Sequence, residues 1–433
     1  MASFKSRVLK PVWYYIKVFA WLILFFLGFA VLSSLVPDKP VRSNIEYSLT
    51  FMENQPSYPH MIIEGMNHRP DYAMDGLMTN IIYTIDNHDV IKSALLGRGR
   101  IDYTSPYVSQ WKWVKYNTLN NKQNPNFFYA RYWHGNSYFF RLFYAFTNYN
   151  EIKWIIFMIT SLLMAFFAIK LGRELGALKA LLLLSGLFFM NVYVMQFSMQ
   201  LSPVLIISVV MSLVLIRWMH RGKNPAVLFF ISGALATYFD LLTAPLLTLG
   251  IPMLLWVSMC GHENNLKTEL WHGFKQLVGF SLLWIVAYSG AWAMKMIITI
   301  PFSELDIVSD VTNQFLRRAG SENITRMDAI MRNFNLIPLV FVNILLLVPV
   351  LLSPFFFNKQ GIAKFVLFLA VAFLPYIWFY GAADHSYGHY WYTYRIQAIT
   401  ISGVLLAVYS LVDWHRVKLQ WRRLFRKKPE MSF

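Results

Sequence analysis

Long apolar runs separated by short polar connections occupy most of this chain. An α-helix needs roughly 20 apolar residues to cross a hydrocarbon core of about 30 Å while it satisfies its own backbone hydrogen bonds. Ten runs approach this length, and we predict a membrane-spanning helix in each: residues 12–36, 154–171, 178–195, 201–219, 226–239, 244–257, 274–300, 336–352, 363–379 and 395–412. The predicted fold is therefore all-α, a polytopic membrane protein with about ten transmembrane helices.

The stretch 226–257 departs from this regular pattern. Each of its halves is short, and Pro245 and Pro252 interrupt the second half. Membrane helices broken in this way often line a cavity. We therefore expect this part of the bundle to line a cavity.

A polar segment, residues 37–151, separates the first apolar run from the second. A transporter seldom places so much chain there, and we predict a large extracytoplasmic loop with amphipathic or interfacial helices. The chain then forms one integral-membrane domain: the first helix, this loop, a bundle at 152–412 and a basic tail at 413–433.

Positive charge is distributed unevenly between the connections. Lysine and arginine gather in alternate connections, at Lys170, Arg217, Lys267 and Lys359, and again in the C-terminal tail. The positive-inside rule places these segments in the cytoplasm. Both termini are then cytoplasmic, and the outside receives residues 37–151, 238–245, 301–335 and 384–395.

The composition fits a membrane protein, with 57% hydrophobic and 14% charged residues, and excludes an ordinary soluble domain. The net charge of +17 is spread over loops and tails, which favours anionic lipid over nucleic acid as a partner.

The single cysteine, Cys260, excludes an internal disulfide and is expected to pack in the core. No small-residue cleavage site follows the first run, so we expect it to remain as an anchor.

Two acidic residues stand out in the first outside segment. Asp71 and Asp75 lie four apart at the start of a helix predicted over 70–85, on one face. A carboxylate at a helix start often does no more than favour the dipole, by about 0.3–1 kcal/mol. Because the pair lies just beyond a membrane surface, we interpret it as a candidate catalytic site. Spacing leaves three alternatives open, Glu64, Asp86 and Asp89.

Residues 129–146 interleave Arg131, His134 and Arg141 with many aromatic residues. Anchoring of an amphipathic helix in the membrane interface explains most of this pattern. Arg131 and His134 are the candidates for a phosphate or sugar contact.

Asp240 and Lys295 lie near membrane depth, where a charge costs several kcal/mol unless it is hydrated or paired. Asp240 is therefore expected to face a cavity. Lys295 has two interpretations: it extends to the interface, or it contacts a phosphate.

The last outside segment, 384–395, concentrates polar and aromatic residues: Asp384, His385, Tyr387, His389, Tyr390, Trp391, Tyr394 and Arg395. The two histidines lack the helical context of a zinc motif, so no metal is predicted. Aromatic rings with histidine and arginine suit a sugar face and an anionic leaving group. Arg317, Arg318 and Arg326 either add positive field or lie on a solvated helix, and residues 323–325 match a glycosylation acceptor.

Five strings carry a resemblance to a known family: MDGLMTN at 74–80, RYWHG at 131–135, YFDLLTAP at 238–245, GAWAMK at 290–295 and HSYGHYWYTYR at 385–395. With one N-terminal span, a large acidic first outside segment and a further bundle, the whole chain resembles the GT-C superfamily of integral-membrane glycosyltransferases. The similarity is to the bacterial branch that decorates cell-wall or surface polysaccharides.

The resemblance implies an inverting transfer at the outer face of the plasma membrane, without a cofactor. The donor would be a sugar on polyprenyl phosphate, and the acceptor a hydroxyl of a polysaccharide or teichoic-acid-like glycan. The family's acidic catalytic position carries over to Asp75, with Asp71 beside it. The expected donor-phosphate contacts are Lys295, Arg395 and Arg131, and the expected sugar or acceptor contacts are Asp240, His134, His385, Tyr387, His389 and Tyr390.

Three other functions compete with this interpretation. A lipid-linked glycan flippase or transporter fits the number of spans, although the sequence shows no pseudo-symmetric pairing of spans. A glycan polymerase or ligase would also use charged outside loops. A structural membrane protein leaves the clustered His, Arg and Asp residues unexplained.

Overall fold

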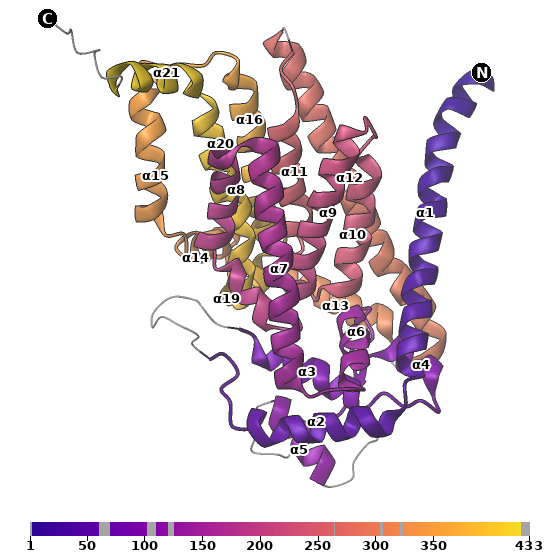
Figure 1. The fold of residues 1–433 in the computed structure, drawn as a ribbon. Helices are drawn as coiled ribbons and strands as arrows, with labels where there is room; N and C mark the ends of the chain where they lie inside the picture. Colours follow the sequence, from indigo (N-terminus) through magenta and orange to yellow (C-terminus); the bar gives the residue numbers. More distant parts are fainter. Residues whose placement is uncertain are drawn as a thin grey trace, which may run out of the picture.

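The computed structural model describes residues 2–59, 70–101, 110–119, 125–263, 265–303, 306–320 and 324–425 (Figure 1). Within these ranges the chain is predominantly helical. Its strands are the two-residue β1 (Arg98–Gly99) and β2 (Phe127–Phe128), which pair antiparallel. The helical fold predicted from the apolar runs is therefore confirmed.

The helices fall into a loop layer, a bundle and its connections. The loop layer contains α2 (Asp38–Met52), α3 (Tyr72–Tyr83), α4 (Val90–Leu96), α5 (Gln110–Leu119) and α6 (Gly135–Tyr144). The bundle contains α1 (Ala2–Ser34), α7 (Tyr149–Leu175), α8 (Ala177–Phe189), α9 (Ser202–His220), α10 (Ala226–Phe239), α11 (Leu247–Met259), α12 (Leu266–Thr299), α15 (Leu339–Leu352), α16 (Gly361–Ala372), α17 (Leu374–Gly381) and α20 (Ala398–Ser410). The connections and tail contain η1 (Val192–Phe197), η2 (Ile300–Phe302), α13 (Ile307–Ala319), α14 (Arg326–Phe334), α18 (Ala383–Gly388), α19 (Tyr390–Thr393), η3 (Tyr394–Gln397) and α21 (Trp414–Phe425).

Five segments of the described chain are long and apolar enough to cross a membrane, and they define a multi-pass membrane protein. They are Val12–Ser34, Tyr149–Leu175, Ser202–His220, Leu266–Phe302 and Gly361–Gly381. A sixth results if α14 and α15, which meet at a bend of 74°, form one broken span. The count of ten stays a prediction, although each of the ten predicted runs lies on helical structure.

Several bundle helices are shorter than the apolar runs that predicted them. The run 178–195 divides into α8 and η1, separated by Asn191 with φ 54°. α10 has 14 residues and α11 has 13, or roughly 20 Å each at 1.5 Å per residue. These helices end inside the molecule, so irregular backbone follows them where neighbouring helices must enclose it.

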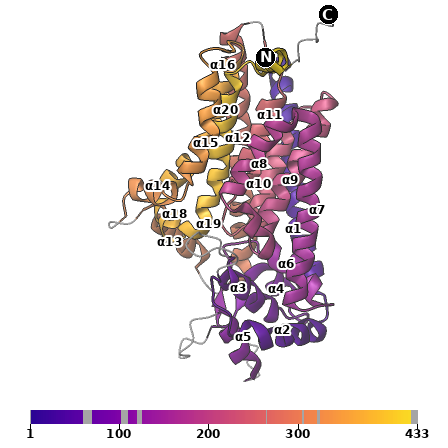
Figure 2. The same cartoon turned by 60° about the vertical axis from the view of Figure 1, so that its left-hand side comes forward.

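The loop layer covers one end of the bundle, and the start of α1 and the helix α21 lie at the other end (Figure 1). Figure 2 shows α2, α3 and α5 below the bundle, with α6 between this layer and the helices above it. The layer has its own apolar core, which includes Val41, Ile45 and Met78 and is separate from the main core of the bundle. Apolar side chains on α7 and α12, among them Leu162 and Leu282, remain exposed on the sides, as a lipid-facing surface requires.

Arg141 joins the loop layer to the first membrane helix. Its buried guanidinium donates to the carbonyl oxygens of Ser33 (3.1 Å), Val36 (2.9 Å) and Ile82 (3.1 Å) and pairs with Asp38. α6 packs between the two layers, against α2 and α3 on one side and α1 and α10 on the other. The position of its aromatic stripe relative to the membrane interface stays a prediction.

Replacing Arg141 by methionine is expected to lower the free energy of unfolding by about 3–5 kcal/mol, because Asp38 and three carbonyl groups lose their donor. Thermal unfolding of the purified protein in detergent measures this loss. Arg173→Met removes an exposed arginine of α7 and serves as the control. An equal midpoint for the two variants would contradict the joining role.

Candidate functional site

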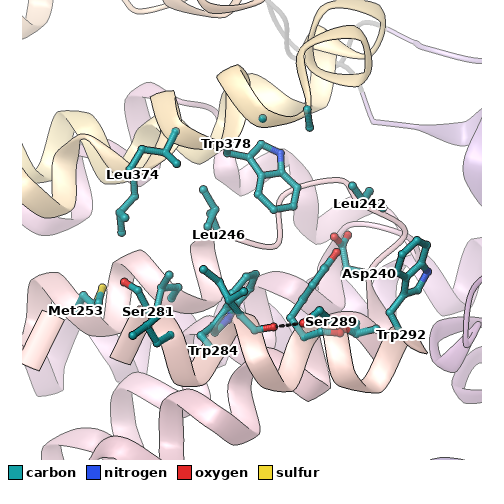
Figure 3. Close-up of a pocket in the computed structure, with 18 of the residues that line it drawn as sticks. Asp240, Leu242, Leu246, Met253, Ser281, Trp284, Ser289, Trp292, Leu374 and Trp378 are labelled. Carbon is teal, nitrogen blue, oxygen red and sulfur yellow. Dashed lines mark hydrogen bonds between the residues drawn. The ribbon is translucent and has the colours of Figure 1, made fainter. Parts of the chain in front are cut away.

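A cavity of about 630 Å³ runs along the bundle between α10–α11, α12 and α16–α17. Figure 3 shows Met253 at one end, Trp284 and Leu246 along its length, and Asp240 and Trp292 at the other end. Its wall is almost entirely apolar, apart from the end at Asp240. The cavity follows the stretch whose short helices and prolines predicted it.

The polar end of the cavity is formed by Asp240, Arg318 and Tyr132. Asp240 follows the last residue of α10, and its buried carboxylate accepts from the backbone N–H of Thr243 (2.9 Å) and from the Thr243 hydroxyl. The guanidinium of Arg318 lies over the Tyr132 ring, 5.6 Å from its centroid. An acidic and a basic side chain therefore border one end of an apolar channel.

A histidine pair supports this end. The His385 and His389 rings stack with centroids 4.7 Å apart, and His385 Nε2 lies 2.8 Å from the Leu242 carbonyl oxygen. Burial lowers the pKa of His385 to about 3, and the charges of His389 and Arg318 act in the same direction. His385 is therefore neutral near pH 7, and its Nε2–H donates to Leu242.

That hydrogen bond holds an unusual backbone conformation. Leu242 has φ 66°, in the left-handed region that costs a leucine roughly 1–2 kcal/mol. Its side chain lines the cavity next to Asp240. The conformation turns the chain sharply enough to place both side chains on the cavity wall.

Asp71 is the N-cap of α3 and is only 1% exposed. Its Oδ1 accepts from the Met74 N–H (2.9 Å), whereas Oδ2 has no hydrogen-bond partner among the residues that the structure describes. The Trp391 indole interacts with this carboxyl without reaching hydrogen-bond geometry, and the charge of Arg395 also acts on it. Asp71 and Arg395, two sequence-predicted residues from distant segments, thus lie within electrostatic range of each other.

Burial raises the pKa of Asp71 to about 7. The Asp75 charge raises it further, while the Met74 N–H, the Arg395 charge and Trp391 oppose the shift. A carboxyl with this pKa gains or loses its proton near neutral pH, which a general base requires.

Asp75 lies one turn later and has a different environment. Its Oδ1 accepts from the Ser198 hydroxyl (2.9 Å) and the Gln200 N–H (2.9 Å), and its Oδ2 from the Tyr149 hydroxyl (2.7 Å) and the Met199 N–H (3.1 Å). Burial raises its pKa to about 6, and these four hydrogen bonds limit the shift. Asp75 fastens α3 to α7 and to the turn before α9.

Tyr392 connects the Asp71 neighbourhood with the cavity. Its pKa is raised well above the ordinary value by burial first and then by the charges of Asp71 and, less strongly, Asp240. Both carboxyls therefore lie within electrostatic range of one buried phenol. Residues 70–75, 238–245 and 384–395, each singled out in the sequence, converge here.

Lys295 and Arg131 bind other parts of the protein. The Lys295 ammonium donates to the carbonyl oxygen of Leu95 in the last turn of α4, where a cation favours the helix dipole, and lies 5.4 Å from the centroid of the Trp133 ring. Arg131 pairs with Asp310 (3.1 Å). Both cations therefore hold neighbouring elements in place.

His134, Tyr387 and Tyr390 also have protein partners. Buried His134 contacts the Tyr129 carbonyl oxygen through Nε2 (2.7 Å), and burial lowers its pKa to about 3. Tyr387 and Tyr390 enclose the Arg332 guanidinium, with ring centroids at 4.2 and 4.0 Å from its central carbon. Their rings form a cation–π sandwich on α14.

Among the alternatives, Asp89 pairs with Arg98 (2.7 Å) and Asp86 accepts from the His88 N–H (2.8 Å). Glu64, the acceptor asparagine at 323 and the tail beyond 425 lie outside the described residues. Tyr132 and Tyr392 were not singled out individually, although both belong to strings marked in the sequence.

Comparisons with protein-family models, with curated proteins and with solved structures found no match.

The two aspartates of α3 are expected to respond differently to the same substitution. Asp75→Asn leaves an NH₂ group facing hydrogen-bond donors, which we expect to cost about 1–3 kcal/mol or more. Asp71→Asn retains an oxygen for the Met74 N–H and should keep close to the wild-type midpoint. Thermal unfolding of both variants tests the distinction, and a greater loss for Asp71→Asn would refute it.

Proposed function

We propose that this protein is an integral-membrane glycosyltransferase, which moves a sugar from polyprenyl phosphate to a hydroxyl of a cell-surface glycan. The observation that supports it most is an apolar cavity with Asp240 and Arg318 on its wall, next to the segment 384–395, which interacts both with Leu242 and with Asp71. A long hydrocarbon chain and a charged, hydroxyl-rich head are the two parts of such a donor.

The cavity suits the polyprenyl chain. Its volume of about 630 Å³ falls within the roughly 300–1,000 Å³ usual for small-molecule sites. Lining residues such as Leu282 and Ile377 are also exposed on the side of the bundle. A lipid tail can therefore enter from the bilayer, and its burial is worth about 25 cal/mol per Å².

Arg318 is the cation best placed for the donor phosphate, because it lines the polar end of the cavity. Negative charge grows on the phosphate as the glycosidic bond breaks, and a fixed guanidinium in a partly dehydrated site stabilises it. Arg395 supplies a second positive charge beside Asp71. Asp240, His385 and His389 then lie where sugar hydroxyls would be held.

Asp71 is our choice for the general base. Its Oδ2 is open to accept a proton, whereas both oxygens of Asp75 are occupied by donors. The acceptor oxygen forms a bond to the anomeric carbon, the bond to the phosphate oxygen breaks, and the proton passes to Asp71. One displacement inverts the anomeric configuration. Asp75, favoured by the resemblance, would act by positioning α3.

The proposed setting is a bacterial plasma membrane crossed by about ten helices. Both termini would be cytoplasmic, and the loop layer would face outward. This orientation is supported by the position of the start of α1 and of α21 at the end of the bundle opposite the loop layer, and by the distribution of lysine and arginine. A polysaccharide or teichoic-acid-like chain at the outer face would then be the acceptor.

A lipid-linked glycan flippase is the second candidate, because a laterally accessible apolar cavity would also suit a lipid in transit. A polymerase or ligase would use the same donor chemistry on another acceptor. Release of polyprenyl phosphate separates these classes, since a flippase leaves the lipid-linked sugar intact.

Asp71→Asn is expected to lower turnover by about 10²- to 10⁴-fold, the usual contribution of a general base. The measurement is release of polyprenyl phosphate by purified protein with crude glycan acceptors. Asp86→Asn is the matched control, since its amide oxygen can still accept from His88. Equal turnover by Asp71→Asn and Asp86→Asn would exclude Asp71 as the base.

In the wild type, kcat/KM should rise with pH up to about 7 and then stay constant, because the carboxylate form of Asp71 is the active one.

Ser281→Trp is expected to raise KM for a long-chain donor about tenfold by filling part of the cavity. Displacing about two methylene groups, at about 0.8 kcal/mol each, suffices for that change. A donor with only two isoprene units should be affected much less. Leu181→Trp, on an exposed position of α8, is the control. Equal effects on the two donors would refute the tail-binding role.

A further inference from the structure

A second cavity lies at the end of the bundle that α21 crosses, opposite the loop layer. It measures about 380 Å³ and is enclosed by the end of α7, the first turns of α8 and α16, the end of α20 and the start of α21. It shares no lining residue with the site described above. Its walls include apolar Leu182 and Leu406, but its distinguishing residues are two lysines, Lys179 and Lys364.

Lys364 is a buried cation whose side chain borders this cavity. It is 9% exposed and makes no hydrogen bond or ion pair within the described part of the chain. Lys179 is close enough to repel it. Glu269 lines a neighbouring small cavity together with Lys364 and attracts it without forming an ion pair, and the Glu269 carboxylate already binds His262 (3.1 Å) and the Glu263 N–H (3.2 Å). The cavity therefore gathers positive charge that lacks a bonded counter-ion.

Two helices also begin at the cavity. α8 starts after Gly176 and α16 after Gln360, and neither start has a side-chain cap. Uncapped first turns direct backbone N–H groups and the positive end of the helix dipole toward an anion. A Cβ at Gly361 would lie 1.9 Å from the Ser410 carbonyl oxygen, so glycine permits the close approach of α16 and α20.

The neighbourhood is that of a membrane surface. α21 lies across this end of the bundle (Figure 1), and its first residue, Trp414, lines the cavity. Arg416, Lys418, Arg422 and Arg423 follow on the same helix. A basic amphipathic helix with an aromatic residue at its start is typical of the headgroup region. Basic pockets between helices at this level commonly receive anionic headgroups.

We propose that this cavity binds the phosphate of an anionic phospholipid, held by Lys179, Lys364 and the first turns of α8 and α16. The apolar walls contact the glycerol and upper acyl carbons, which distinguishes this ligand from a free phosphate. The site is independent of the transferase proposal, because it uses other residues at the opposite end of the molecule.

The test is native mass spectrometry of the full-length protein in detergent, titrated with phosphatidylglycerol or phosphatidylcholine. Wild type should bind phosphatidylglycerol at least tenfold more tightly than phosphatidylcholine. Lys364→Met and Lys179→Met should each weaken phosphatidylglycerol binding about tenfold, the effect of losing one charge-assisted contact. Lys223→Met removes an exposed lysine at the same end of the bundle that does not line the cavity, and should change binding less than twofold.

Lys179 is exposed and can be replaced without disturbing the core. Phosphatidylglycerol binding by Lys179→Met therefore tests the proposal even if Lys364→Met fails to fold. Equal binding of the two lipids by wild type, or unchanged binding by Lys179→Met, would overturn the proposal. Excess inorganic phosphate should leave bound phosphatidylglycerol in place. Displacement by phosphate alone would assign the site to a soluble phosphate compound and overturn the lipid assignment.

Discussion

The carboxylate of Asp75 fixes the relation between the loop layer and the membrane bundle. Its four donors come from α7 and from the turn that precedes α9, whereas Asp75 itself belongs to α3. A buried carboxylate with fewer partners would be expensive, so this arrangement resists sliding of the layer over the bundle. Asp71, one turn earlier on α3, takes its position beside Arg395 from this attachment.

The same attachment influences the chemistry of its neighbour. The Asp75 charge contributes to the raised pKa of Asp71, so the residue that positions α3 also adjusts the proton affinity of the proposed base. Arg395 and the Met74 N–H act in the opposite direction. The balance keeps Asp71 near the midpoint of its titration at neutral pH, a state that an isolated exposed aspartate would not reach.

The sequence predicted what depends on local pattern. Apolar runs located the helices, and the segments containing Asp71, Asp240 and His385 converge as polar groups near a cavity. The local pattern could not predict long-range partners. Nothing near Lys295 in the chain indicates that the Leu95 carbonyl oxygen accepts a hydrogen bond from its ammonium, or that Asp310 pairs with Arg131. Spacing put Asp71 and Asp75 on one face, but only Ser198 and Tyr149, far along the chain, separate their roles. The short lengths of α8 and α10 likewise arise from tertiary packing.

The shortness of α10 has a consequence for how the cavity selects what enters it. A helix of about 21 Å is shorter than a hydrocarbon core of about 30 Å, and the turn from Asp240 to Thr243 that follows it is enclosed by neighbouring elements, with both of these residues 1% exposed. Its hydrogen bonds to Thr243 and His385 then have little competition from solvent. The turn from Asp240 to Thr243 is therefore rigid, and it selects ligands by shape. A ligand whose polar groups do not reach the polar groups of this turn leaves its own hydrogen bonds unsatisfied and binds weakly.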